Sequence, residues 1–166
     1  MPHLRVVAGV AVAAVVLDQL TKTWALRRLG DRRPFEVIGS LRFNLTWNTG
    51  TAFSLGDDLN LGPFIAVVAL AVVGWLLWAG YTARTVGAVA AGLVAGGAVG
   101  NLIDRALRSG PAGAPAGFMG GAVVDFIDLQ WWPVFNVADA GIVCGAVLLV
   151  VVSLFEPREP AEAGAG

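Results

Sequence analysis

Four stretches of this 166-residue chain are apolar over the length of a membrane-spanning helix, and they constrain the fold more than any other feature. A helix needs about 20 apolar residues to cross a bilayer, and in lipid only helices and closed barrels satisfy their own backbone groups. The chain is 14% charged, whereas soluble domains average about 25%. We therefore predict an all-α membrane protein with four transmembrane helices, over about residues 6–24, 61–81, 85–106 and 135–155.

The remaining segments predict one polytopic membrane domain over residues 1–155, with a disordered polar tail over 156–166. In the first long loop, apolar and polar residues alternate from Leu41 to Trp47, as in a β-strand with one apolar face. This pattern predicts a small β element within residues 31–58. The first apolar stretch resembles a secretory signal, but charges interrupt its end and no small-residue cleavage site follows, so we interpret it as a retained helix.

An even number of spans places both termini on one side of the membrane and both long loops on the other. Polar residues lie at the loop ends of the predicted spans, so we expect their side chains to meet at one face. Ionisable groups inside a membrane are rare and are functional candidates. The residues expected at this face are Asp18, Asn48, Asn101, Asp104, Asp125 and Asp139.

Asp125 and Asp139 each lie where an apolar run meets the membrane surface. Two carboxylates that meet can share one proton and activate a water molecule, which is the chemistry of aspartic peptidases. Asn136 and Asp139 also have the spacing of a helix N-cap and its third residue, so helix capping is an alternative role for Asp139. A helix N-terminus favours an ionised carboxylate, which predicts an ionised Asp139 and a protonated Asp125. Asp128 is the competing acid, and its interfacial tryptophan neighbours predict that it is exposed.

Several other polar residues have two open interpretations. Asp18 and Lys22 are spaced to pair on one helix face, either to neutralise two charges or to support the site. Asp104 and Arg105 form either an interfacial salt bridge or a set of supporting groups. Glycines that repeat every four residues in the third stretch predict close helix packing, and these are Gly92, Gly96 and Gly100.

The composition argues against several classes of protein. A net charge of −1 and the lack of a basic run argue against nucleic-acid binding. The only cysteine is Cys144 and the only histidine is His3, so we expect no disulfide, metal or cofactor. Two other functions stay open, a Ser/Lys hydrolase that uses Ser54 and Lys22 and a small transporter or proton-relay protein.

Five motifs together resemble one family, the bacterial lipoprotein signal peptidases, or signal peptidase II. The motifs occur in the order of the family, and the resemblance covers about residues 6–155. They are Asp18-Gln19-x-x-Lys22, Asn48-Thr49-Gly50-Thr51-Ala52-Phe53-Ser54, Gly100-Asn101-x-x-Asp104-Arg105, Val123-Val124-Asp125-Phe126 and Phe135-Asn136-x-Ala138-Asp139.

The resemblance implies an intramembrane aspartic endopeptidase that removes signal peptides from diacylglyceryl-modified prolipoproteins by cutting before the lipidated cysteine. It implies that Asp125 and Asp139 are the catalytic pair. The expected partners are the lipidated prolipoprotein and membrane lipids, with no nucleic acid, and we expect a monomer. Supporting or substrate-binding roles are expected for Asp18, Lys22, Asn48, Asn101, Asp104, Arg105 and Asn136.

The resemblance also implies a multi-pass protein of the bacterial plasma membrane, with cytoplasmic termini and a site near the extracytoplasmic face. The charge distribution argues for the reverse orientation, because cytoplasmic loops usually carry more lysine and arginine. We follow the resemblance on this point. The terminal side carries Arg5, Arg84 and Arg158, and the loop side carries Lys22, Arg27, Arg28, Arg32, Arg33, Arg42, Arg105 and Arg108.

Overall fold

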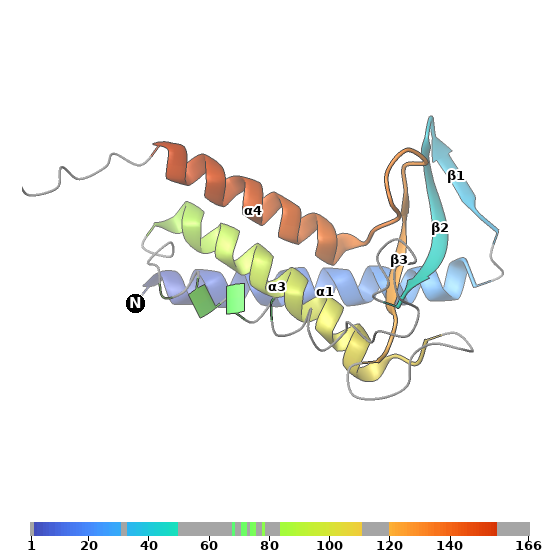
Figure 1. Cartoon of the computed structure of the whole chain (residues 1–166), viewed down its shortest axis with the longest axis horizontal. Helices are drawn as coiled ribbons and strands as arrows, with labels where there is room; N and C mark the ends of the chain where they lie inside the picture. The colour runs from blue at the N-terminus through green and yellow to red at the C-terminus, as the bar shows by residue number, and fades with distance from the viewer. Residues whose placement is uncertain are drawn as a thin grey trace, which may run out of the picture.

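The structure is a computed structural model in which three long helices form a bundle and a small sheet closes one end (Figure 1). The helices are α1 (Pro2–Arg28), α3 (Thr85–Leu107) and α4 (Val137–Phe155). In the described part of the chain, these three have the length and apolar composition to cross a membrane. The described residues are 2–30, 33–49, 84–110 and 120–155, with the separate positions 68, 71, 72, 74, 75 and 78.

The predicted first, third and fourth helices correspond to α1, α3 and α4. The helix α1 extends beyond the predicted bounds of residues 6–24 at both ends. The predicted second helix, residues 61–81, lies largely outside the described residues, and the separate positions described within it are helical. The total of four helices therefore stays a prediction.

The helix α3 lies between α1 and α4 and packs along both of them (Figure 1). Gly92, Gly96 and Gly100 all face α1, where an added Cβ would lie 2.7 Å or less from an atom of that helix. On the other side of α3, a Cβ at Gly97 would overlap the carbonyl oxygen of Ala138 in α4. The close packing that the glycine repeat predicts is confirmed, since only the lack of side chains lets these backbones approach.

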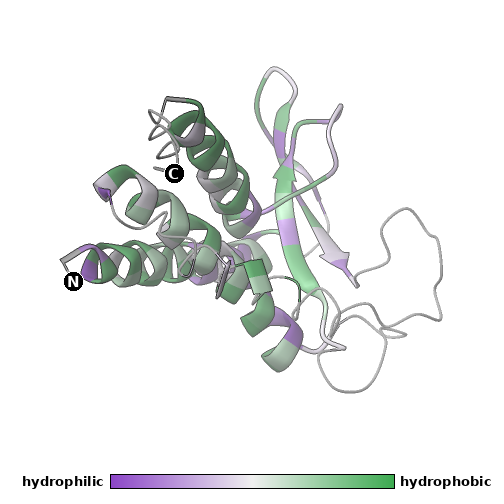
Figure 2. Cartoon of the chain, turned by 60° about the vertical axis from the view of Figure 1, so that its left-hand side comes forward, coloured by the Kyte–Doolittle hydropathy of each residue, from purple (hydrophilic) through white to green (hydrophobic). Residues whose placement is uncertain are grey.

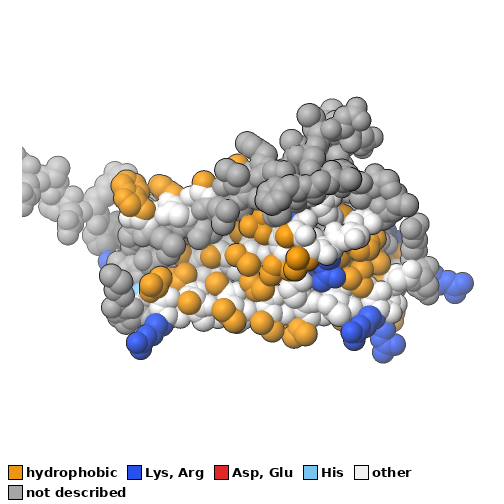
Figure 3. Space-filling view, turned by 90° about the horizontal axis from the view of Figure 1, so that it is seen from below, with side chains coloured by type: hydrophobic (Ala, Val, Ile, Leu, Met, Phe, Trp, Pro, Cys, Tyr) orange, Lys and Arg blue, Asp and Glu red, His pale blue; other side chains and the backbone are white. Residues whose placement is uncertain are grey.

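The outer surface of the bundle is apolar, as expected for a protein surrounded by lipid. Large hydrophobic side chains of all three helices are exposed there, such as Val12, Leu20, Val86 and Val147. Figure 2 shows hydrophobic residues along the helices and hydrophilic ones mainly near their ends and in the sheet. In Figure 3, hydrophobic side chains occupy the middle of one face, with lysines and arginines toward both ends.

The sheet contains three antiparallel strands in the order β1-β2-β3, namely β1 (Phe35–Ile38), β2 (Leu41–Asn48) and β3 (Val123–Asp128). It lies at the end of the bundle that is far from the N-terminus (Figure 1). The strand predicted at Leu41–Trp47 is confirmed as part of β2. The strand β3 was not predicted, although it contains Asp125, which pairs with Thr46 of β2 in the register of the sheet.

A second apolar core attaches the sheet to the end of α1. Ala25 of α1 and Leu29, which directly follows this helix, are buried together with Phe126 of β3, and Phe43 of β2 packs against this cluster. The ring of Trp24 meets the Phe43 ring edge-on, with centroids 5.1 Å apart. Because the end of α1 supports both β2 and β3, it fixes the position of the sheet relative to the helices.

The chain from β3 to α4 is also held by backbone hydrogen bonds. Phe135 forms an isolated antiparallel bridge with Ile127, in which each backbone N–H donates to the carbonyl oxygen of the other residue. The next residues along the chain are Asn136 and the first turn of α4. This bridge therefore brings the start of α4 back beside β3.

Candidate active site

Asn136 links the side chains of Asp125 and Asp139. Its Nδ2 donates to Asp125 Oδ1 at 2.6 Å. Its backbone N–H donates to Asp139 Oδ2 at 3.1 Å, and its Oδ1 accepts from the backbone N–H of Asp139 at 3.0 Å. The reciprocal bonds are those of a capping box, so Asp139 caps α4 as its spacing allowed. The same contacts hold Asp139 beside the residue that binds Asp125.

The two carboxylates lie in different environments. Asp125 is 3% exposed, whereas Asp139 is only partly buried. Burial and, to a smaller extent, the negative charge of Asp139 raise the pKa of Asp125 to about 7. Hydrogen bonds from Asn136 and Asn48 to Asp125 oppose this rise only in part. Asp125 therefore holds a proton at a pH where an ordinary aspartate is ionised.

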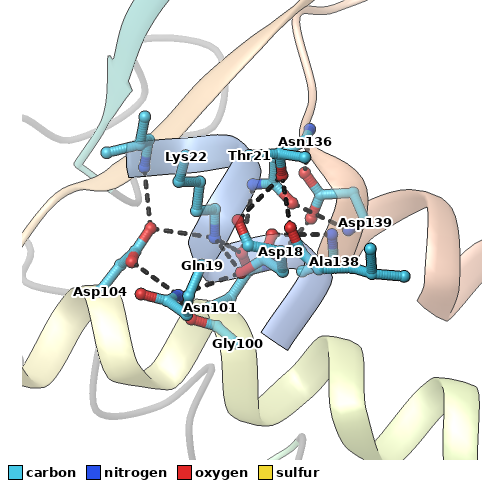
Figure 4. A network of polar contacts seen from close by, with 12 residues as sticks. Asp18, Gln19, Thr21, Lys22, Gly100, Asn101, Asp104, Asn136, Ala138 and Asp139 are labelled. Carbon is cyan, nitrogen blue, oxygen red and sulfur yellow. Dashed lines mark hydrogen bonds and ion pairs between the residues drawn. The ribbon is translucent and has the colours of Figure 1, made fainter. Parts of the chain in front are cut away.

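A buried ion cluster lies next to the pair and joins α1 to α3 (Figure 4). Lys22 Nζ is 2.9 Å from Asp18 Oδ2 and 2.9 Å from Asp104 Oδ2, and all three side chains are fully buried. Asp18 Oδ1 also accepts a hydrogen bond from the backbone N–H of Ala138 at 3.0 Å. The predicted pairing of Asp18 with Lys22 is thus confirmed, and the pair also fixes the residue before Asp139.

Asn101 connects this ion cluster to the carboxylate of Asp139. Its Oδ1 accepts from Lys22 Nζ at 2.9 Å and from Asn136 Nδ2 at 3.2 Å. Its Nδ2 donates to Asp139 Oδ1 at 2.8 Å. The contacts in Figure 4 therefore form a continuous polar path from Lys22 to Asp139.

Asp104 and Arg105, near the C-terminal end of α3, face different partners. Asp104 Oδ1 accepts from Arg108 Nε at 2.6 Å, and Asp104 Oδ2 accepts from the backbone N–H of Val124 in β3 at 3.1 Å. Its charge is balanced by Lys22 and Arg108, so it does not depend on a salt bridge with Arg105. Arg105 is 5% exposed, and its Nη1 has no hydrogen-bond partner among the described residues. Its positive charge acts on Asp125, Asp104 and Asp139.

Two residues of this network had no predicted role. Gln19 Nε2 donates to Asp18 Oδ2, to the carbonyl oxygen of Gly100 and to Asp104 Oδ1, each at 3.1 Å. Arg108 Nη2 donates to Gln19 Oε1 at 3.0 Å. The available signals were a polar residue inside an apolar helix and the four-residue spacing of Asp104 and Arg108.

The prediction that Asp128 is exposed is wrong. Its side chain is 5% exposed and forms a salt bridge with Arg42 Nε at 2.8 Å. It also accepts hydrogen bonds from Asn44 Nδ2 at 3.1 Å and from the backbone N–H of Gln130 at 2.7 Å. Burial alone would raise the pKa of Asp128, but these hydrogen bonds lower it below its ordinary value. Asp128 is an ionised residue that joins β2 to β3.

This arrangement predicts a structural effect for Asp128→Asn. We expect it to lower the free energy of unfolding by about 1–3 kcal/mol, because hydrogen bonds to a charged group are lost. Cleavage activity should survive, since Asp128 contacts Arg42 and not the Asp125–Asp139 pair. Thermal unfolding in detergent, with an activity assay on the same sample, measures both effects. A loss of activity without a loss of stability would contradict this assignment.

The structure bears on the two alternative functions. Lys22 is fully buried with its Nζ in contact with two carboxylates, so the amine is already engaged and is badly placed to act as a general base. Its proposed partner Ser54 lies outside the described residues. The described helices have one acidic residue each, Asp18, Asp104 and Asp139, all in the polar network near the sheet. This placement does not form a path of acids across the bundle.

Comparison with known proteins places the chain in a family. A family model described as signal peptidase (SPase) II matches residues 10–155. The chain belongs to the signal peptidase II family. It is similar to the lipoprotein signal peptidase of Rhodococcus jostii, with 46% identity over 153 residues that make up 91% of this chain and 72% of that protein. The corresponding enzyme of Mycolicibacterium smegmatis is 40% identical over an alignment of 178 residues, with 99% of this chain and 72% of the relative covered.

A solved structure described as a bacterial membrane enzyme has a similar fold. Its TM-score is 0.69 and its sequence identity is 26%, with 95% of this chain and 92% of that chain covered. Family membership agrees with the apolar helices of this peptidase, which identify it as a membrane enzyme. The resemblance found in the sequence motifs is therefore confirmed at the level of the family.

Proposed function

We propose that this signal peptidase is an intramembrane aspartic endopeptidase that cleaves diacylglyceryl-modified prolipoproteins before the lipidated cysteine. The observation that carries the proposal is the hydrogen-bonded link from Asp125 through Asn136 to Asp139. The lipoprotein signal peptidases among its relatives support the substrate class. The different environments of the two carboxylates support a division of labour between an acid and a base.

In the proposed mechanism, Asp139 is the general base and Asp125 is the general acid. Asp139 takes a proton from a water molecule while protonated Asp125 donates to the scissile carbonyl oxygen. The water oxygen attacks the carbonyl carbon and forms a gem-diol intermediate. As the C–N bond breaks, the proton on Asp139 passes to the leaving amine, and Asp125 regains its proton from the gem-diol. No covalent intermediate between enzyme and substrate forms.

The remaining predicted site residues fit supporting roles in this scheme. Asn136 and Asn101 hold the carboxylates of the pair, and Asn48 contacts Asp125. The ion cluster of Asp18, Lys22 and Asp104 holds α1, α3 and the start of α4 together. We propose that Arg105 stabilises negative charge that develops at the scissile carbonyl, since its charge already acts on both carboxylates.

We further propose that the termini are cytoplasmic and that the active site lies near the extracytoplasmic face. The substrate would be held in part by its acyl chains, because burial of each CH₂ contributes about 0.8 kcal/mol. The enzyme would act as a monomer among membrane lipids. The resemblance supports this orientation, whereas the distribution of arginines argues against it.

Cleavage of a diacylglyceryl-modified precursor by the purified enzyme tests the proposed function. The products should be a free signal peptide and a protein that begins with the lipidated cysteine, which mass spectrometry identifies. A matched precursor without the lipid should be cleaved poorly, because its acyl chains contribute no binding energy. Equal cleavage of both precursors, or cleavage at another bond, would contradict the proposal.

The raised pKa of Asp125 predicts how cleavage depends on pH. Asp125 must be protonated to act as the acid, and its pKa is about 7. We therefore expect kcat/KM to fall as the pH rises above about 7, by about tenfold per pH unit well above the pKa. Initial rates between pH 5 and 9, at substrate concentrations below KM, measure this limb. A rate that stays constant over this range would contradict the role of Asp125 as the acid.

A further inference from the structure

The contact between Lys22 and Asn101 is not explained by charge balance. Lys22 already lies 2.9 Å from each of two carboxylates, those of Asp18 and Asp104. Its third contact is to a neutral oxygen, Asn101 Oδ1, at 2.9 Å. The Lys22 side chain that makes these three contacts is fully buried. This third contact therefore has a role apart from neutralising the ion cluster.

The neighbours of Asn101 determine which way its carboxamide points. A lysine ammonium group only donates hydrogen bonds, so it must face the amide oxygen. An ionised carboxylate only accepts, so Asp139 must face the amide nitrogen, from which it lies 2.8 Å. In the reversed orientation the NH₂ group would meet the ammonium group, and the oxygen would meet the carboxylate. Lys22, the closer of the two donors to this oxygen, thus favours the orientation that presents an N–H donor to Asp139, and the Nδ2 of Asn136, at 3.2 Å from the same oxygen, favours it as well.

The consequence is that both oxygens of Asp139 accept from N–H donors. Oδ1 accepts from Asn101, and Oδ2 accepts from the backbone of Asn136. Hydrogen bonds to the charged form of a carboxylate favour that form. Without the bond from Asn101, the ionised form of Asp139 would lose one of these two donors.

We propose that Lys22 is a positioning residue that orients the Asn101 carboxamide and thereby keeps the negative charge of the catalytic pair on Asp139. This inference rests on the proposed function of Asp125 and Asp139. The N-terminus of α4 also favours an ionised Asp139. The oriented Asn101 carboxamide is then a second, separate cause of the same preference. The raised pKa of Asp125, which burial and the charge of Asp139 produce, agrees with this division of charge.

Other charged groups near the pair do not favour negative charge on Asp139 over negative charge on Asp125. Arg105 on α3 acts on both Asp125 and Asp139, so it does not select one of them. The charge of Lys22 itself also acts weakly on Asp125. Besides the pair itself, the charged groups that act on it in the described residues are Lys22 from α1 and Arg105 from α3, and Asp18 of α1 and Asp104 of α3 lie behind them in contact with Lys22.

The proposed mechanism needs an ionised Asp139, so kcat/KM should also fall at low pH, where this base takes up a proton. The test compares this acidic limb of the pH profile in matched variants. Lys22→Met alone would leave a buried Asp18 charge without its partner, so both arms carry Asp18→Asn, which keeps an acceptor for the Ala138 N–H. We expect Asp18→Asn/Lys22→Met to move the acidic limb to higher pH by about one unit relative to Asp18→Asn, because the donor to ionised Asp139 is no longer fixed. Asn101→Ala, which leaves the Lys22 ion pairs in place, should cause a shift of similar size and sign.

The combined variant separates orientation from simple charge. When Asn101→Ala is also present, removing Lys22 should move the acidic limb by less than half as much, since no carboxamide remains to be oriented. Equal shifts with and without Asn101, or a fall in thermal stability without a shift, would overturn the inference. If wild-type enzyme fails to cleave the lipidated precursor, the proposed function fails instead, so the two failures are distinguishable. Should the lysine variants not fold, Asn101→Ala alone, which removes the donor to Asp139 without adding a charge, must move the limb to higher pH or the inference is wrong.

Discussion

Replacing either Asp125 or Asp139 with asparagine should reduce cleavage of a lipidated precursor by at least about 10³-fold. An asparagine at position 139 cannot take a proton from water, and one at position 125 cannot supply the acidic proton to the carbonyl oxygen. Both substitutions preserve side-chain volume and leave a polar group for Asn136 to contact. The loss should therefore appear in kcat rather than in membrane insertion or thermal stability.

The double substitution sharpens this expectation. Residues that act as one catalytic unit have non-additive effects, so Asp125→Asn/Asp139→Asn should be scarcely less active than either single variant. Asp128→Asn is the matched control, because it removes a buried carboxylate from the same strand without touching the pair. Substantial activity in either single variant, with the control unchanged, would remove the basis for an aspartic mechanism.

The sequence could predict the helices because each one must satisfy its backbone and present apolar side chains to lipid. It underestimated α1, which continues through Arg27 and Arg28. Hydropathy reports the part of a helix inside the bilayer, whereas the hydrogen-bonded turns continue into the polar boundary. The end of α1 is stabilised there by Ala25 and Leu29, which pack against the sheet. This contact depends on residues far away in the sequence.

The strand β3 was not predicted for a related reason. Its residues Val123, Val124 and Phe126 are buried on both faces, so the segment lacks the alternation that identified β2. A short apolar run cannot be assigned from its period alone. Asp128 was misjudged in the same way, because exposed residues follow it from Gln130 to Trp132, while its partner Arg42 lies 86 residues away.

The candidate site was predictable in part. Motif spacing indicated the Asp18–Lys22 pair and the cap formed by Asn136 and Asp139, because both depend on helix geometry alone. The contacts of Asn101 with Lys22 and Asp139 were not predictable, since they join side chains that are 79 and 38 positions apart. Such contacts depend on how closely α1, α3 and α4 pack, and the glycines of α3 determine that distance.

Gly97→Ala should accordingly lower both the stability and the activity of the enzyme. The added Cβ would overlap the carbonyl oxygen of Ala138 and lie 2.7 Å from Cγ1 of Ile142, so α4 must move away from α3. Overpacking of this kind costs about 1–3 kcal/mol of folding stability. Because Ala138 precedes Asp139, the shift also displaces the proposed base, and a displacement of about 1 Å can reduce the rate about 10²-fold.

The matched control is Gly9→Ala in α1, where an added Cβ would meet nothing within 4 Å. Alanine favours a helix by about 1 kcal/mol over glycine, so this variant should be as stable as the wild type or slightly more so, with unchanged cleavage. Thermal unfolding in detergent and cleavage of the lipidated precursor measure both effects for each variant. If Gly97→Ala behaved like Gly9→Ala, the close contact between α3 and α4 would not be what holds Asp139 near Asp125. The same displacement of Ala138 would strain the hydrogen bond that its N–H donates to Asp18 of α1. Because this bond helps to position the residue next to Asp139, we expect Gly97→Ala to lose more activity than its loss of stability alone would produce.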